Sequence, residues 1–385
     1  MFQYTPPNSV AIRRLIVEDS EDDALLIQEC LAEAASLAYE STRSETLAGA
    51  LQILDREYVD VVLLDLGLPD SQGLQALDTM RAAFRSVPIV VLTGVNDADI
   101  GVAAIQRGAQ DFLTKAKAQS DSELLVRAIV YAIERRRMEV RDAEMAAVRD
   151  IQKRLFPTKA PSVRGFDISG ICHPVNSAGG DYFDFLALPD GQLGIVVADV
   201  SGHGLGPALV MAELRAYIVG MLNVGRSVDE VLATANRLLF AETSSDIFVT
   251  LFLLRLDPIQ KNCRWIGAGH NALRVAADGR CEELVATTLP LAVKPRLEVV
   301  PSPTISLATG DTLVLCTDGV CEAFSESGET FGMHRAKAIL QEHRSSSSLD
   351  TANALFRAAR AYGGNREQTD DMTIVVVKAV HDEAE

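Results

Sequence analysis

Five aspartates stand in four acidic spots far apart in this chain, and three of these spots adjoin apolar, strand-like runs. They are Asp181, Asp199, Asp318, Asp370 and Asp371. Asp199 follows the apolar run 194–198, so it should lie where a buried strand ends. Divalent cations such as Mg²⁺ and Mn²⁺ prefer oxygen ligands and are often held in pairs that activate a water and clamp a phosphoryl group. Carboxylates gathered from several strand ends would make such a site.

Taken alone, Asp199 also fits an ordinary turn-forming residue at the end of a strand. The glycines that follow it, Gly202 and Gly204, let the backbone approach a ligand closely. The other acidic spots favour the interpretation of Asp199 as a metal ligand over that of a turn-forming residue.

A second set of polar residues lies in the N-terminal part of the chain. Apolar strands predicted at residues 11–17, 59–64, 87–92 and 111–114 alternate with stretches of helical character such as 21–35. This alternation predicts an α/β domain with a doubly wound parallel sheet and a site at the carboxyl ends of its strands. Those ends carry Glu18, Asp19, Asp65, Thr93 and Lys115.

At these residues the segment 10–121 resembles the receiver domain of two-component response regulators. The motifs that carry the resemblance are Val-Glu-Asp-Ser, Asp-Leu-Gly-Leu-Pro-Asp-Ser-Gln-Gly, Leu-Thr-Gly and Leu-Thr-Lys, in this order. The resemblance implies that Asp65 accepts a phosphoryl group from a cognate histidine kinase. The Mg²⁺ ligands that it implies are Glu18, Asp19, Asp65 and the Gly67 carbonyl.

Three further residues receive switch roles from the same resemblance. Lys115 would pair with the acceptor or phosphoryl oxygens, and the Thr93 hydroxyl would donate a hydrogen bond to a phosphoryl oxygen. Phe112 would be the aromatic residue whose rotamer reports that bond. An ordinary core phenylalanine at a strand is the alternative for Phe112.

The segment 158–380 resembles the PPM-type metal-dependent Ser/Thr protein phosphatases, within them the bacterial SpoIIE-like branch. Four motifs carry the resemblance, namely Gly-Gly-Asp-Tyr-Phe-Asp, Asp-Val-Ser-Gly-His-Gly, Thr-Asp-Gly-Val and Thr-Asp-Asp-Met-Thr. It implies that Asp199 bridges two metal ions and that the Val200 carbonyl binds one of them. The other ligands that it implies are Asp181, Asp318 and Asp370, with Asp371 as the second member of its pair.

The resemblance also implies a reaction. The catalytic residues would be Asp199, Asp318 and Asp370, and the two Mg²⁺ or Mn²⁺ ions would activate a water for in-line attack on a phosphoserine or phosphothreonine, without a covalent enzyme intermediate. His203 is a candidate general acid, and a structural hydrogen bond is its alternative. The arginine that cradles phosphate in eukaryotic relatives has no counterpart before Gly179.

Residues 122–157 form the predicted helical linker between the two domains. Helix-forming residues continue without proline or glycine up to Pro157, and one stripe is mostly apolar but is interrupted by Glu134, Arg141 and Gln152. This pattern predicts a short dimerising or switch helix and a homodimer. The basic run 135–137 is interpreted as a solvated helix face.

The remaining segment, 158–385, predicts strands, two helices and further strands. The expected strands are 165–173, 184–188, 194–198, 248–255, 262–267, 272–276 and 306–308, and the expected helices are 207–221 and 228–241. This order suits an α/β/β/α sandwich, which is also the fold of the PPM family. The glycine- and histidine-containing cluster 267–271 is interpreted first as a structural turn near the site.

Composition limits the classes of partner. The formal net charge of −17 argues against nucleic-acid binding, which needs a basic patch. The six cysteines include no Cys-x-x-Cys pair, which favours reduced thiols. We expect no signal peptide, no apolar span long enough for a membrane helix, no membrane partner and a cytoplasmic location.

The sequence therefore predicts a response regulator whose output is metal-dependent protein dephosphorylation, controlled at Asp65. The resemblance suggests a phosphorylated anti-sigma factor antagonist as substrate. The alternative is a non-catalytic adaptor that binds a sigma factor or another partner in a phosphorylation-dependent way. A third possibility is a nucleotide-cyclising or other phosphoryl-transfer output domain. The sequence lacks the phosphate-binding loop for this activity, since no Gly-x₄-Gly-Lys-Ser/Thr motif occurs.

Overall fold

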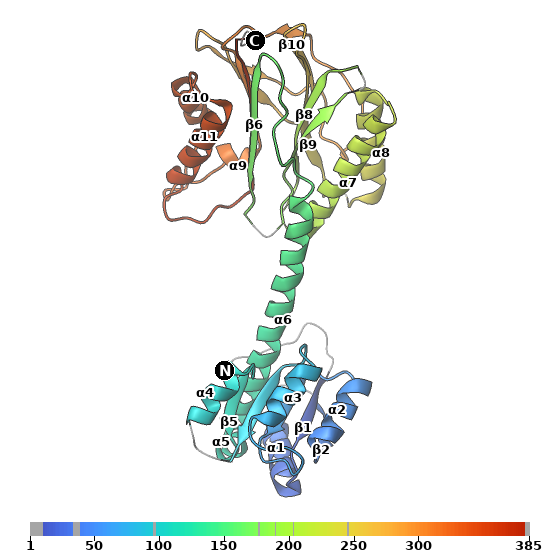
Figure 1. The fold of residues 1–385 in the computed structure, drawn as a ribbon, viewed down its shortest axis with the longest axis vertical. Coiled ribbons are helices and arrows are strands. Elements are labelled where there is room, and N and C mark those ends of the chain that lie inside the picture. Colours follow the sequence, from blue (N-terminus) through green and yellow to red (C-terminus); the bar gives the residue numbers. More distant parts are fainter. Residues whose placement is uncertain are drawn as a thin grey trace. The chain divides into compact units, whose positions relative to one another are not determined.

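The computed structural model describes residues 11–33, 39–94, 98–175, 178–188, 190–202, 204–244 and 246–381 (Figure 1). Its contacts divide the chain into two compact units, Met1–Ala143 and Glu144–Glu385.

The first unit is built on five parallel strands in the order β2-β1-β3-β4-β5. They are β1 (Ile12–Val17), β2 (Tyr39–Ser44), β3 (Val61–Asp65), β4 (Ile89–Thr93) and β5 (Asp111–Thr114). The helices are α1 (Glu21–Glu33), α2 (Leu47–Arg56), α3 (Gln75–Ala83), α4 (Ala98–Gln106), α5 (Lys115–Ser120) and the first part of α6 (Ser122–Lys153). The predicted doubly wound parallel sheet is confirmed.

Two hydrophobic clusters cover the two faces of this sheet, which explains why its inner strands are continuous apolar runs. Residues of α2 and α3 pack on one face, and residues of α1, α5 and α6 pack on the other. From α6, Leu125, Ile129 and Ile133 are buried in the second cluster. The core of the first unit therefore includes residues that the sequence analysis assigned to the linker.

The second unit contains two five-stranded antiparallel sheets, with strand orders β13-β10-β9-β8-β7 and β12-β11-β14-β15-β6. The strands are β6 (Phe166–His173), β7 (Tyr182–Ala187), β8 (Leu193–Val200), β9 (Val249–Asp257), β10 (Asn262–Ala268), β11 (Ala272–Val275), β12 (Cys281–Leu284), β13 (Ile305–Ser306), β14 (Thr312–Cys316) and β15 (Met372–Ala379). The helices are α7 (Leu205–Asn223), α8 (Val228–Glu242), α9 (Asp318–Cys321), α10 (Gly332–Glu342) and α11 (Ser348–Tyr362).

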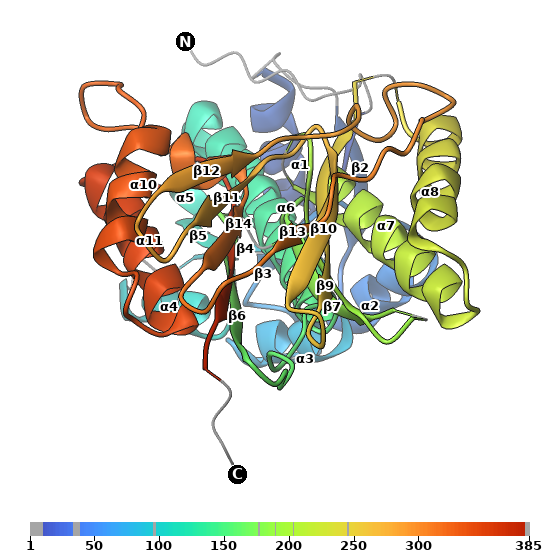
Figure 2. The same ribbon diagram turned by 90° about the horizontal axis from the view of Figure 1, so that it is seen from above.

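These elements of the second unit form four layers. One cluster fills the space between the sheets, a second lies between α7 and α8 and the β8 sheet, and a third lies between α10 and α11 and the β14 sheet. The end-on view shows the two helical layers on opposite sides of the paired sheets (Figure 2). The predicted α/β/β/α sandwich is confirmed, although α9, α10 and α11 were not located from the sequence.

Helix α7 corrects one expectation. Among the described residues it is the one helix whose length and composition would suit a membrane span. Its residues Val210, Met211, Leu214 and Ile218 are buried, and they pack into the cluster shared with α8 and the β8 sheet. Packing on both a sheet and a second helix therefore accounts for part of its apolar composition, while Leu205 and Leu209 are exposed.

Candidate active site and phosphoacceptor site

The carboxylates predicted for the first unit lie at one edge of its sheet. Glu18 and Asp19 follow β1, and Asp65 is the last residue of β3. Because β1 and β3 are parallel neighbours, their carboxyl ends meet. One carboxylate oxygen from each of the three residues lies within 4.8 Å of the others, which is a spacing suited to one small cation.

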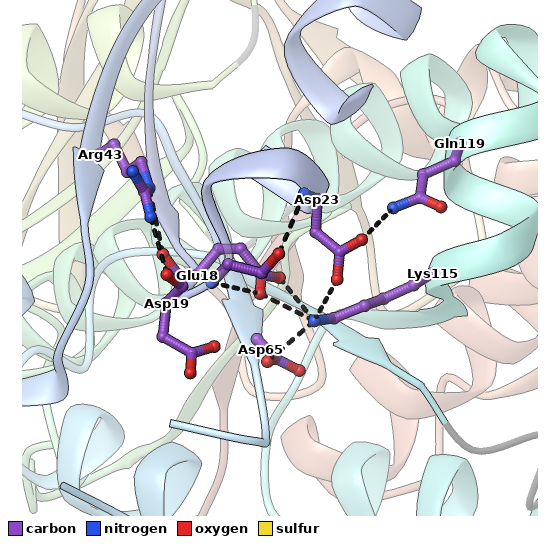
Figure 3. A network of polar contacts seen from close by, with 8 residues as sticks. Glu18, Asp19, Asp23, Arg43, Asp65, Lys115 and Gln119 are labelled. Carbon is purple, nitrogen blue, oxygen red and sulfur yellow. Dashed lines mark hydrogen bonds and ion pairs between the residues drawn. The ribbon is translucent and has the colours of Figure 1, made fainter. Parts of the chain in front are cut away.

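The ammonium group of Lys115 lies among these carboxylates (Figure 3). Its partners are Glu18 at 2.8 Å and Asp23 and Asp65 at 3.0 Å each. Burial acts to lower the pKa of Lys115, but the bonds to Glu18 and Asp65 outweigh it and raise that pKa. The lysine is therefore held as a built-in cation of the site.

Lys115 acts to lower the pKa of both Glu18 and Asp23, but burial gives Glu18 the opposite net shift. Burial raises the pKa of Glu18, although the hydrogen bond from Lys115 opposes this. The hydrogen bond from Lys115 lowers the pKa of the more exposed Asp23, and Gln119 adds to the effect. Asp23 was missed in the sequence because an acidic residue in the first turn of a helix is ordinary.

Asp65 also opens onto a cavity of about 820 Å³ that is lined by Gly67, Thr93 and Lys115 among others. Thr93, the last residue of β4, is buried. The half-buried ring of Phe112 lies against Gly101 of α4, where a Cβ atom would be 2.1 Å from the ring. Thr93 and Lys115 thus lie at the same end of the sheet as Asp65. Phe112, the second residue of β5, packs against the hydrophobic cluster on the α2 and α3 face of the sheet, and its position depends on the absence of a side chain at residue 101.

In the second unit the five predicted aspartates come from both sheets. Asp199 is the penultimate residue of β8, and Asp181 directly precedes the neighbouring strand β7. Asp318 begins α9 immediately beyond β14, while Asp370 and Asp371 directly precede β15, the neighbour of β14. Each sheet therefore delivers carboxylates to the same end of the sandwich.

Thr317 joins the two sheets within this acidic cluster. Its hydroxyl donates a hydrogen bond of 2.8 Å to Asp181 and accepts one of 3.0 Å from the backbone N–H of Thr373. Its own N–H donates to the Thr373 carbonyl at 3.1 Å. All three residues are buried, so this chain of bonds fixes Asp181 relative to the β14 and β15 ends.

The aspartates raise one another's affinity for protons. Burial raises the pKa of Asp199 to about 7, with added contributions from Asp318 and Asp370. Burial and the charge of Asp199 raise the pKa of Asp181. Within the described part of the chain, no basic side chain forms an ion pair with any of the five aspartates. Among the described residues, these aspartates therefore have no directly paired basic side chain.

The backbone around Asp199 is packed as a ligand site would require. A Cβ atom on Gly180 would lie 2.5 Å from the Val200 carbonyl oxygen and 3.4 Å from Asp199 Oδ1, so only glycine leaves both oxygens clear. In the described residues of this unit, no three carboxylates lie within 4.8 Å of one another. In any three of these aspartates, at least two carboxylates are therefore farther apart than those of the cluster in the first unit. All the donors are hard oxygens, and this set fits divalent cations.

Comparisons with known proteins agree with both resemblances. Residues 15–130 match the response regulator receiver domain, and residues 189–380 match the family described as Stage II sporulation protein E (SpoIIE). The chain joins a receiver domain to a SpoIIE-type phosphatase domain. The predicted recognition is confirmed, as is the class of enzyme, a protein serine/threonine phosphatase.

Individual relatives share this organisation in part. The chain is 25% identical to the phosphoserine phosphatase RsbU of Bacillus subtilis over 238 residues, which are 61% of this chain and 70% of RsbU. It is 23% identical to protein IcfG of Synechocystis sp. over 394 residues, 90% of this chain and 58% of IcfG. The SiaA-PP2C domain of Pseudomonas aeruginosa superposes with a TM-score of 0.54 at 23% identity, covering 63% of this chain and 98% of that domain, and so has the same fold.

Gln152, near the end of α6, contacts the phosphatase site directly. Its side-chain amide donates to the Gly179 carbonyl at 2.7 Å and accepts from the Gly179 N–H at 3.1 Å. A Cβ atom on Gly179 would lie 1.9 Å from Asp371 Oδ2, so this backbone touches the aspartate. The second carboxylate oxygen of Asp371 accepts the N–H of Val175 at 2.8 Å.

A cavity of about 390 Å³ adjoins this contact in the phosphatase domain. Its lining includes Arg149, Gln152 and Lys153 from α6 together with Asp181 and Asp371. The end of α6 and the acidic cluster therefore share a surface.

His270, from the cluster 267–271, is buried beside the phosphatase site. Its Nε2 lies 3.0 Å from the Cys316 carbonyl oxygen and its Nδ1 lies 3.1 Å from the Thr250 hydroxyl. A carbonyl can only accept, so Nε2 carries the proton and Nδ1 accepts from Thr250. Burial lowers the pKa of His270, which keeps the ring neutral. The histidine supports the strand end that precedes Asp318.

Some site residues were missed in the sequence or lie beyond the structure. Gln152 was noted only as one of three polar interruptions of an apolar stripe, and nothing in the sequence distinguished it from Glu134 and Arg141. Thr317 was noted only within its motif, and nothing local indicates a bond to Asp181. His203, the candidate general acid, lies outside the described residues.

Proposed function

We propose that the phosphatase domain hydrolyses phosphoserine or phosphothreonine on a small protein with two divalent cations, Mg²⁺ or Mn²⁺, and that the receiver controls it through Asp65. The observation that carries this proposal is the convergence of five aspartates with no basic partner among the described residues. Two bound cations would offset this charge, activate a water and stabilise charge that develops on the phosphoryl group.

The roles proposed for single residues follow from their positions. Asp199, with carboxylate neighbours from both sheets, is the proposed bridging ligand, and the Val200 carbonyl lies beside it. Asp318, Asp370 and Asp371 complete the proposed set from the other sheet. Thr317 holds Asp181 by a hydrogen bond and so acts as a positioning residue.

The proposed substrate is an anti-sigma factor antagonist in its phosphorylated form. The similarity to RsbU, a phosphoserine phosphatase, supports a phosphoserine protein substrate. A receiver domain also implies a phosphodonor, and the proposed donor is a cognate histidine kinase.

The proposed regulatory connection is the contact between Gln152 and Gly179. Because α6 runs without a break from Ser122 to Lys153, its first part packs in the receiver core and its last part carries Gln152. A shift of the helix end by an ångström would break two hydrogen bonds to the backbone that leads to Asp181 and touches Asp371. Phosphorylation at Asp65 would in this way change the alignment of the aspartates.

The test is phosphate release from a phosphoserine protein by the full chain with Mn²⁺. We expect release by the native protein and its loss in Asp199→Ala and Asp318→Ala. Arg154→Ala, at an exposed position just after the end of α6, is the matched control and should retain the native rate. No release with any of several phosphoserine substrates, together with partner binding unchanged by Asp199→Ala, would favour the adaptor alternative.

A further inference from the structure

Asp23, in the first turn of α1, is held in place by two side chains of α5 in the receiver. Its Oδ2 accepts a hydrogen bond from the Lys115 ammonium group at 3.0 Å, and its Oδ1 accepts one from the Gln119 amide at 3.0 Å (Figure 3). Lys115 and Gln119 stand one helical turn apart on α5. Because both of its oxygens are bonded to the same helix, the carboxylate of Asp23 is fixed beside Lys115.

The ammonium group of Lys115 has all of its N–H groups in use. A lysine ammonium carries three donors, and here they bond to Glu18, Asp23 and Asp65. The side chain of Lys115 is only 16% exposed, so water has little access to it. A phosphoryl oxygen that accepts a bond from Lys115 would therefore have to replace or share the place of one of these carboxylates.

Among these three partners of Lys115, Asp23 is the one outside the proposed Mg²⁺ ligands. Oxygens of Glu18 and Asp65 lie within 4.8 Å of each other and of Asp19, and Mg²⁺ would draw on their negative charge when it binds. The carboxylate of Asp23 keeps its charge directed at Lys115. The partner with which a phosphoryl group has to compete is therefore Asp23.

We propose that Asp23 competes with a phosphoryl group on Asp65 for the ammonium group of Lys115, and so favours the unphosphorylated receiver. This inference rests on the proposed role of Asp65 as phosphoacceptor. Two effects have the same sign. Asp23 takes up part of the charge of Lys115, and it repels the negative charge that a phosphoryl group brings to a site sharing the same ammonium.

The group transfer itself balances without a part for Asp23. An oxygen of Asp65 attacks the phosphorus of a phosphohistidine, the P–N bond breaks, and its electron pair stays on the imidazole nitrogen. In the loss of the phosphoryl group, water attacks the phosphorus and the P–O bond to Asp65 breaks. The electron pair then returns to the carboxylate, and the proton of the water goes to solvent. Asp23 is thus a positioning residue that acts through Lys115.

The test is equilibrium binding of beryllofluoride, a phosphoryl analogue that bonds to an aspartate oxygen, to the full chain with Mg²⁺, followed by fluorine NMR. The bound signal that is absent in Asp65→Asn reports the receiver site and excludes binding elsewhere in the chain. We expect Asp23→Asn to lower the dissociation constant of the analogue about fivefold, which is the size of one partly exposed, charge-assisted hydrogen bond.

Asp22→Asn is the matched control. Asp22 is exposed in the same turn of α1, and its side chain forms no hydrogen bond or ion pair with any residue that the structure describes. This variant removes the same charge and should leave the dissociation constant unchanged. Asp23→Glu keeps the carboxylate and should stay close to the native value. If Asp23→Asn does not fold, Asp23→Ala provides the same comparison.

The sign of the effect separates this role from a structural one, because a damaged receiver would bind the analogue more weakly. Equal or weaker binding by folded Asp23→Asn overturns the inference, as does equal tightening in Asp22→Asn. If neither the native protein nor Asp23→Asn gives a signal that depends on Asp65, the proposed control through Asp65 fails, and the inference fails with it.

Discussion

In the receiver, carboxylates of Glu18, Asp23 and Asp65 surround the ammonium group of Lys115 at 2.8–3.0 Å. In the phosphatase domain, five aspartates converge without an ion pair to any basic side chain of the described residues. The receiver cluster carries its own cation and can keep its shape before a metal arrives. The phosphatase cluster has no such partner among the described residues, so the proposed cations would contribute to both its stability and its chemistry.

The largest expected effect is loss of hydrolysis when the unbalanced cluster is altered. Asp199→Ala should lower phosphate release from a phosphoserine protein by about 10²- to 10³-fold, the range for removing one electrostatic group from a catalytic site. Asp184→Asn is an informative comparison, because Asp184 belongs to the motif that contains Asp181 but bonds to Tyr182 and Arg215. Equal losses in both variants would show that the effect comes from folding rather than from the site.

Removing the ammonium group of Lys115 from the receiver cluster should leave its carboxylates without a basic partner, as in the phosphatase cluster. Lys115→Ala leaves buried Glu18 and Asp65 without their partner, which should lower the free energy of unfolding by about 3 kcal/mol. Mg²⁺ should restore part of that loss. Lys117→Ala, on the exposed face of the same helix, is the control for chemical denaturation. An unchanged stability in Lys115→Ala would contradict the role of Lys115 as the built-in cation.

Metal binding should stabilise the phosphatase domain in a pH-dependent way. The folded-state pKa of Asp199 is raised to about 7, above its ordinary value, so the metal-free domain loses stability as pH rises from about 4 through 7. Mn²⁺ at about 100 times its dissociation constant adds about 2.7 kcal/mol. The rise in Tm with Mn²⁺ should therefore be larger near pH 8 than near pH 5. Equal shifts at both pH values would contradict the account.

The smallest expected effect on stability comes from the contact that joins α6 to the phosphatase cluster. Gln152→Ala removes two hydrogen bonds and should cost about 1–2 kcal/mol. It should also reduce the difference in the rate of phosphate release between protein that is phosphorylated at Asp65 and protein that is not. Gln152→Glu keeps the acceptor for the Gly179 N–H, so it should retain more of this difference in rate than Gln152→Ala does. Regulation that persists fully in Gln152→Ala would exclude this contact as the connection.

The sequence predicted those parts of the molecule that depend on local pattern. Strands β1, β3 and β4 are apolar runs with polar residues at or just beyond their carboxyl ends, and a parallel sheet brings these ends together. Strand β2 was missed because Tyr39–Ser44 is mostly polar at the sheet edge. The (βα)₅ and sandwich architectures could be predicted from the sequence because they follow from the order of such runs.

Contacts between residues far apart in the chain could not be predicted from the sequence in this way. The bond from Thr317 to Asp181 and the bonds between Gln152 and Gly179 join positions far apart in the chain. Threonine and glutamine carry no charge that would mark them as site residues. The pairing of Lys115 with Asp23 was hidden for a similar reason, since α1 begins with three acidic residues and only the fold selects one.

The central claim is the proposal that the phosphatase aspartates bind divalent cations. Its most direct test is equilibrium Mn²⁺ binding to the full chain carrying Asp19→Asn and Asp65→Asn, which removes the receiver site. We predict about two bound ions per chain, and fewer when Asp199→Ala is added. Absence of Mn²⁺ binding by the folded Asp19→Asn, Asp65→Asn protein at millimolar metal would contradict the claim.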